Sequence, residues 1–184
     1  VQNIGRLNND RVDIWFRNVV NGPDQLRQRV AFALSEIMVV SQQSALQNTP
    51  YALADYYDLL ARDAFGDFRQ LMEDVTLHPA MGVYLSMLGN QKPDAARNIR
   101  PDENYARELM QLFTIGLVQL NADGTPRLGA NGKPIETYGP ADVSNLARVF
   151  TGYVLDESGH VQGTRPERYR NPMKVDPARH STLD

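Results

Sequence analysis

Residues 102–117 read D-E-N-Y-A-R-E-L-M-Q-L-F-T-I-G-L, and this stretch decides the fold. Asp102 suits the N-cap position of a helix, and Pro101 keeps the chain before it non-helical. At 100° per residue the apolar side chains fall on one broad arc, as on a helix with one buried side. These side chains are Tyr105, Ala106, Leu109, Met110, Leu112, Phe113 and Leu117. The stretch therefore predicts one long central helix.

The polar side of this predicted helix carries the candidate site, and it has two interpretations. In the first, Glu103 pairs with Arg107 and Asn104 reaches Glu108, each across one helical turn, on a solvated face. In the second, Asn104, Arg107 and Glu108 line a pocket. Glu108 would then act as a base, or Arg107 would bind an anion.

Apolar periodicity, N-cap residues and helix-breaking Gly and Pro predict a mainly α fold of six or seven helices. We expect one bundle-like domain over residues 1–155. The predicted helices cover residues 10–21, 24–41, 50–64, 68–77, 80–88, 102–117 and 140–152. The residues expected in one core are Leu26, Val30, Leu34, Ile37, Leu109, Leu112, Phe113, Leu146 and Phe150.

The predicted helix over residues 24–41 becomes apolar on nearly every side toward its end, which is typical of a buried helix. We therefore expect it at the centre of the bundle. Arg29 and Glu36 lie two turns apart on one side of it, and buried charges need partners. This predicts that Arg29 or Glu36 contacts Arg107 or Glu108.

After the central helix, residues 118–138 alternate with a period of two around Asp123-Gly124 and Asn131-Gly132, which are strong hairpin dipeptides. They predict a small β-hairpin or meander inserted in the helical domain, and we identify no internal repeat there. Residues 156–184, rich in Gly and Pro, are expected to form a loop-rich tail that continues into further chain, with at most one more strand or hairpin.

His78 is the one histidine with a catalytic interpretation. It follows Asp74 by one turn at the predicted end of a helix, where the helix dipole favours it and Asp74 would orient it. The other histidines, His160 and His180, form no H-x-x-x-H pattern with it, and the chain has no cysteine. The sequence therefore predicts neither a metal nor a cofactor.

Composition limits the classes of partner. A net charge of −3 without a cluster of Lys and Arg argues against nucleic acid. No run of 18 apolar residues exists, so no membrane span is expected. The sequence does not decide the oligomeric state.

Four blocks of the chain resemble a family of bacterial proteins catalogued as domain of unknown function 1800. The most specific is E-N-Y-A-R-E-L at residues 103–109, which continues through Leu112, Thr114 and Gly116. The others lie at residues 26–41, 78–85 and 141–153, where Tyr153 stands in place of the Trp that the family more often has. The resemblance assigns no catalytic residue. It implies a longer, exported parent protein, encoded beside a sulfatase-like family.

Two functions follow as hypotheses. The first is an interaction or accessory module that presents the β insertion and the loop over residues 89–101 to a protein or cell-surface partner. The alternative is a hydrolase-like enzyme that uses Glu108 with Arg107, Asn104 and His78. A third interpretation, a carbohydrate or small-ligand binder, needs several exposed Tyr rings on one surface.

Overall fold

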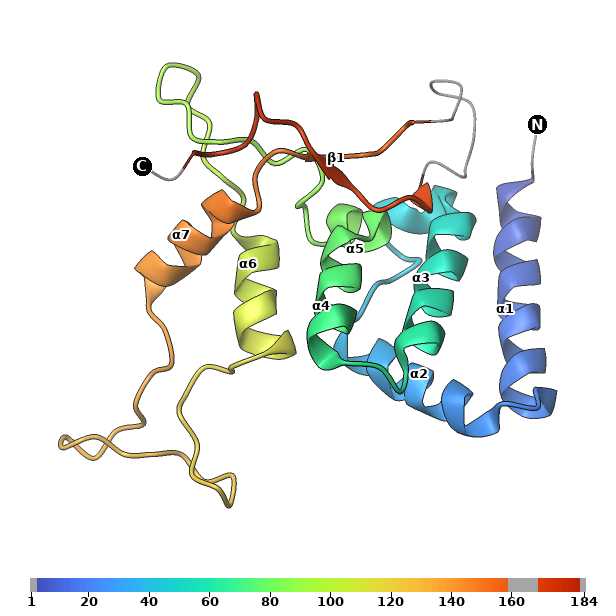
Figure 1. Ribbon diagram of the computed structural model, residues 1–184, viewed down its shortest axis with the longest axis horizontal. Coiled ribbons are helices and arrows are strands. Elements are labelled where there is room, and N and C mark those ends of the chain that lie inside the picture. Colours follow the sequence, from blue (N-terminus) through green and yellow to red (C-terminus); the bar gives the residue numbers. More distant parts are fainter. Residues whose placement is uncertain (1–2, 159–168, 183–184) are drawn as a thin grey trace. The chain divides into compact units, whose positions relative to one another are not determined.

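The computed structural model describes residues 3–158 and 169–182 (Figure 1). Within them the chain is mainly helical, with helices α1 to α7 and one short pair of strands, which confirms the predicted fold class. The chain divides into two compact units. One comprises Val1–Leu88 and Val154–Lys174, and the other comprises Gly89–Tyr153 and Val175–Asp184. The domain boundary at residue 155 stays a prediction, and His160 lies outside the described residues.

The first unit is an assembly of helices in which one face of α3 is buried. Its Ala52, Tyr56 and Leu60 are almost fully buried, and the Tyr56 hydroxyl donates to the carbonyl of Met38, 2.7 Å away. The helices are α1 (Ile4–Asn21), α2 (Gln25–Ile37), the 3-10 turn η1 (Ala45–Asn48), α3 (Pro50–Asp63), α4 (Phe68–Leu77) and α5 (Pro79–Tyr84).

Local signals start α3, α4 and α5 within one residue of the predicted positions. Pro50 occupies the first turn of α3, where its missing N–H leaves no helical bond unmade. The Asp67 carboxylate accepts from the backbone N–H groups of Arg69 and Gln70 and so caps α4. His78 ends α4 and also caps α5, with Pro79 as the first residue of that helix.

Two predictions for the N-terminal helices are wrong. α1 begins at Ile4 instead of residue 10. The apolar periodicity of residues 10–21 predicts that Val12, Trp15, Phe16 and Val19 face inward, but only Val19 is buried, Trp15 is half-buried, and Val12 and Phe16 are exposed. α2 ends at Ile37 and is not buried on all sides, since Leu26 is 70% exposed. Other core residues expected from this helix are exposed or only half-buried: Ile37 is exposed, and Val30 and Leu34 are half-buried.

The predicted ionic network around α2 is also wrong, because it required buried charges. Arg29 and Glu36 are both exposed, and the Arg29 guanidinium donates to the Gln25 side chain of the same helix. Exposed charges need no buried counter-ion, since water solvates them. The apolar side chains of α2 therefore lie on a surface that is partly exposed to solvent.

The second unit is built on α6 (Asn104–Glu108), the π-helical turn η2 (Leu109–Phe113) and α7 (Pro140–Val149). Its core includes Tyr105, whose ring packs edge-on against Phe150 with centroids 4.9 Å apart. The Asn90 side chain bonds the backbone of Asp102 in both directions and fixes the start of α6. The short strands β1 (Tyr153–Val154) and β2 (Lys174–Val175) pair with each other.

The central helix is therefore shorter than predicted. The α-helical part ends at Glu108, and the π turn carries the chain to Phe113, after which the N–H groups of Ile115 and Gly116 both donate to Met110. A π turn holds more residues than an α turn, so the 100° register no longer applies. As a result Phe113 is buried, as expected, whereas Leu112 is 57% exposed.

Residues 117–137, which we call the β extension, differ from the predicted meander. Three short extended segments pair through isolated bridges, and the third segment bonds the first as well as the second. The N–H of Gln119 donates to Ile135, that of Ile135 donates to Arg127, and that of Arg127 donates to Gln119, at 2.8–2.9 Å. Each of the three segments is thus hydrogen-bonded to the other two.

A repeat of eight residues underlies this closure, so the expectation of no internal repeat is wrong. Residues 120–127 read L-N-A-D-G-T-P-R, and residues 128–135 read L-G-A-N-G-K-P-I. The two predicted turns are present at equivalent places, with φ of 83° at Gly124 and 74° at Gly132. Because the two turns are equivalent, residues 119, 127 and 135, which are eight positions apart, each donate one backbone hydrogen bond within this set and accept one.

Candidate functional site

The predicted cluster on α6 forms an ion pair that joins two helices. The Arg107 guanidinium donates to Glu103 one turn earlier, at 3.0 Å, and the second Glu103 oxygen accepts from the Ser144 hydroxyl of α7. Arg107 and Asn104 are exposed, and Glu108 is half-buried. In the described part of the chain, the side chains of Asn104 and Glu108 do not bond each other. The arrangement at Glu103 and Arg107 corresponds to the first interpretation of this face.

His78 is buried, with 4% of its surface exposed, and both of its ring nitrogens are engaged. Nδ1 accepts from the backbone N–H of Ala80 at 3.0 Å, so the proton of the neutral ring is on Nε2. Nε2 then donates to the Asp55 carboxylate at 3.3 Å. The Tyr56 ring stands edge-on to the imidazole, 5.2 Å between centroids. These contacts lock the orientation of the ring.

The partner of His78 is Asp55 of α3, not Asp74 as the sequence suggested. Asp74 instead accepts from the Arg62 guanidinium and from Gln70. Asp55 also forms an ion pair with Arg170, at 2.9 Å. Neither Asp55 nor Arg170 was a candidate, because residues separated by 115 positions leave no signal of their contact in one sequence.

Two carboxylates on α3, Asp55 and Asp58, have pKa values that are shifted in opposite directions. Burial by itself raises the pKa of Asp55, but the hydrogen bonds and charges of His78 and Arg170 outweigh it, so this pKa lies below 3.8. Burial and the charge of Asp55 raise the pKa of Asp58, against a smaller opposing effect of Arg170. Both carboxylates line a cavity of about 580 Å³, together with Arg62, Asp74, His78 and Arg170.

We expect Asp58→Asn to stabilise the protein at pH 7. A carboxyl whose pKa is raised by folding contributes stability below its unfolded pKa, near 3.8, and loses it as the pH rises through the folded value. Because Asp58 is partly exposed and screened, the gain in midpoint should be small, about 1–2 °C. Thermal unfolding at pH 7 and pH 3.5 checks this, and the gain should vanish at the lower pH. An unchanged gain at pH 3.5 would contradict the electrostatic cause.

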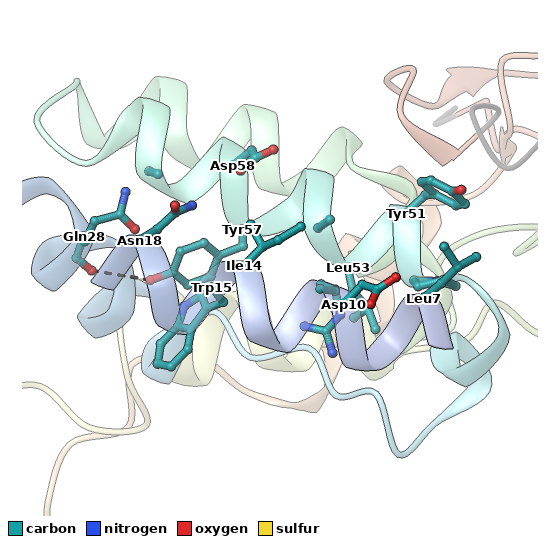
Figure 2. Close-up of a pocket in the computed structure, with 14 residues that line it drawn as sticks. Leu7, Asp10, Ile14, Trp15, Asn18, Gln28, Tyr51, Leu53, Tyr57 and Asp58 are labelled. Carbon is teal, nitrogen blue, oxygen red and sulfur yellow. Dashed lines mark hydrogen bonds between the residues drawn. The ribbon is translucent and has the colours of Figure 1, made fainter. Parts of the chain in front are cut away.

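A second cavity, of about 350 Å³, lies among α1, α2 and α3, and its wall is largely apolar (Figure 2). Ile14, Trp15, Leu53 and Tyr57 contribute to this wall. The Tyr57 hydroxyl donates to the backbone carbonyl of Gln28 at 3.4 Å, and burial raises the pKa of Tyr57. The polar groups around the cavity come from Asp10, Arg11, Asn18, Gln28 and Asp58.

Trp15 is the centre of an aromatic cluster. Its ring lies 4.9 Å from Phe16, 6.0 Å from Phe32 and 6.1 Å from Tyr57, measured between centroids. The cluster separates the cavity of Figure 2 from a third one, of about 460 Å³, because Arg11, Trp15, Leu53 and Tyr57 line both. Trp15 of α1 and Tyr57 of α3 therefore shape both cavities, and Phe32 of α2 lines the third one.

No group of three or more His, Cys, Asp or Glu side chains is arranged to hold a metal ion in residues 3–158 and 169–182. Of the helices described, none is both long and apolar enough to cross a membrane.

Comparison with models of protein families gives a match over the whole chain. Residues 1–184 match a family model described as "Protein of unknown function (DUF1800)", in agreement with the resemblance in the four sequence blocks. Neither the curated proteins nor the solved structures contain a match to the chain.

Proposed function

We propose that the chain, which belongs to the DUF1800 family of proteins of unknown function, is an interaction module whose β extension binds a protein partner. The observation that carries this proposal is a fixed backbone with exposed leucines. Leu117, Leu120 and Leu128 are 54%, 56% and 62% exposed. Burying one leucine fully stabilises a contact by about 1.5–3 kcal/mol.

The backbone of the β extension supports this role because it is already held in place. Its three segments bond one another, and the Asp123 carboxylate accepts from both the N–H and the hydroxyl of Thr125 in the first turn. These bonds with Thr125 also hold the pKa of Asp123 below its usual range. A surface that is ordered before binding loses less conformational entropy when a partner docks.

The repeat adds a geometric argument. Leu120 and Leu128 occupy equivalent positions of the two octapeptides. Arg127 precedes Leu128 in the sequence, and Lys133 precedes Pro134, which pairs with Leu128. Apolar anchors among charged residues are typical of the centre and rim of protein interfaces. The same proposal includes an exported parent protein, as the family resemblance implies, and fractionation of the source cells tests that part.

Site-specific photo-crosslinking in the source organism tests the proposal. A benzophenone side chain at residue 120 or 128 should give the same discrete adduct, whereas one at Leu26, the most exposed leucine of α2, should not give it. The double variant Leu120→Ser/Leu128→Ser, with the benzophenone at Arg127, should lose the adduct while its unfolding midpoint changes by only about 1–2 °C. An identical adduct from residue 26, or none from 120 and 128, would refute the proposal.

The hydrolase-like alternative, with Glu108, Arg107, Asn104 and His78, has less support. Arg107 is held by Glu103, and His78 uses one ring nitrogen to cap α5 and the other to bond Asp55. A general base or acid needs a ring nitrogen free to reach the substrate. The alternative would require these bonds to break in the active state.

A further inference from the structure

Arg11 is the charged side chain whose environment is hardest to explain by folding alone. It is half-buried on α1, and in the described part of the chain it makes no ion pair. Burial accordingly lowers the pKa of its guanidinium. Its Nη2 donates to the side-chain oxygen of Gln42, but its Nε is buried without an acceptor. A half-buried cation without a counter-ion destabilises the fold unless a bound group supplies the negative charge.

The edge of the guanidinium formed by Nε and Nη2, of which only Nη2 has an acceptor, has the geometry of a carboxylate site. Nε and Nη2 present two parallel N–H bonds, and a carboxylate accepts both at once with its two oxygens. The Gln42 amide offers a single neutral oxygen and satisfies only Nη2. Gln42 precedes η1 and lies outside any helix.

The third cavity lies beside this edge and is apolar. Arg11 and Gln42 line it together with aromatic and aliphatic side chains, several of which are exposed to solvent. The exposed members are Val12, Phe16, Phe32 and Val39. Glu36 is the one carboxylate in its wall, and it is exposed and makes no ion pair with Arg11 within the described residues. With about 460 Å³, the cavity is within the range of small-molecule sites.

We infer that this cavity binds a small amphipathic carboxylic acid, with the carboxylate on Nε and Nη2 of Arg11 in place of Gln42 and the apolar body against Trp15, Phe16 and Phe32. The positive charge is complementary to the head group, and the aromatic wall is complementary to the tail. This site belongs to the first unit and is independent of the β extension proposed above.

Trp15 is the only tryptophan in the chain and lines the cavity, so its fluorescence reports binding directly. The probes are octanoate and 4-phenylbutyrate, each compared with its uncharged amide. The wild type should bind each acid about tenfold or more tightly than the amide, since hydrogen bonds to charged groups contribute about 1.5–3 kcal/mol. Arg11→Met should remove this preference while the amide still binds.

Gln42→Glu is the matched second variant, and it keeps the test decisive if Arg11→Met does not fold. An internal carboxylate at position 42 should occupy Arg11, raise the unfolding midpoint and abolish the preference for the acids. The inference is overturned if acid and amide bind the wild type equally, if millimolar acid leaves Trp15 fluorescence unchanged, or if Gln42→Glu binds the acids like the wild type.

Discussion

Gly152→Ala should lower the thermal unfolding midpoint by roughly 6–12 °C. Gly152 has φ of +82°, which costs an alanine about 1–2 kcal/mol. In addition, an alanine Cβ would lie 2.8 Å from the Asp176 carbonyl oxygen and from the backbone and Cβ of His180. Backbone atoms on both sides must then shift, which adds about 1–3 kcal/mol. Calorimetry or circular dichroism measures the change.

Gly89→Ala is the matched control, because it shares the strain but not the clash. Gly89 has φ of +81°, and no heavy atom lies within 4 Å of the place that an alanine methyl group would occupy. The backbone around both glycines is bonded in the same way: Gly89 N–H donates to Tyr153, and Gly152 N–H donates to Asn90. The control should lose less, roughly 2–8 °C, because the strain alone costs about 1–2 kcal/mol. Equal losses in the two variants would show that the contacts of Gly152 with residues 176–180 are dispensable.

The starts of α3 and α4 were predictable because the chemistry that sets them is local. Pro50 and Asp67 act within one turn of their own positions, so one sequence suffices to place α3 and α4. For the helix over residues 50–64 the apolar periodicity predicts an inward face of Leu53, Tyr56, Tyr57 and Leu60. All of these are buried except Tyr57, which is half-buried. A regular α-helix with one buried side preserves the 100° relation between sequence and burial.

The errors arise where burial depends on the rest of the chain. α2 has a buried pattern in sequence, but only the packing of its neighbours decides that Leu26 and Ile37 are exposed. The π turn at residues 109–113 has no propensity signature of its own and breaks the register of the central helix. The octapeptide repeat differs from these, because it is a local feature of positions 120–135 and the sequence alone is sufficient to predict it.

The candidate site was predictable only in part, for the same reason. The pair of Glu103 and Arg107 follows from their spacing of four residues. The partners of His78 do not, because Asp55 precedes it by 23 positions and lies on another helix. The environment of Arg11 also escapes sequence reasoning, since burial of a charged residue on an exposed amphipathic helix is set by tertiary packing.

His78→Ala should destabilise the protein by about 3 kcal/mol, or roughly 6–12 °C. The change removes the cap of α5, which contributes about 0.5–2 kcal/mol, and takes a hydrogen bond from the half-buried Asp55 carboxylate, at about 1–3 kcal/mol. His78→Asn is the control. Asn is a good N-cap but is too short to reach Asp55, so about half of the loss should return. If His78→Ala and His78→Asn are equally unstable, the whole loss of stability comes from the lost hydrogen bond to Asp55.

The pH dependence of this loss identifies its electrostatic part. The pKa of Asp55 is lowered by folding, so its contribution to stability is present above the unfolded value of 3.8 and is lost as the pH falls through the folded value. Without His78 the pKa of Asp55 should move back toward its ordinary value, because part of what lowers it is gone. The difference in unfolding free energy between wild type and His78→Ala should therefore be largest above pH 4 and should shrink at lower pH. Chemical denaturation across pH 2.5–6 measures it. A constant difference over that range would assign the role of His78 to capping and packing alone, since neither depends on the charge of Asp55.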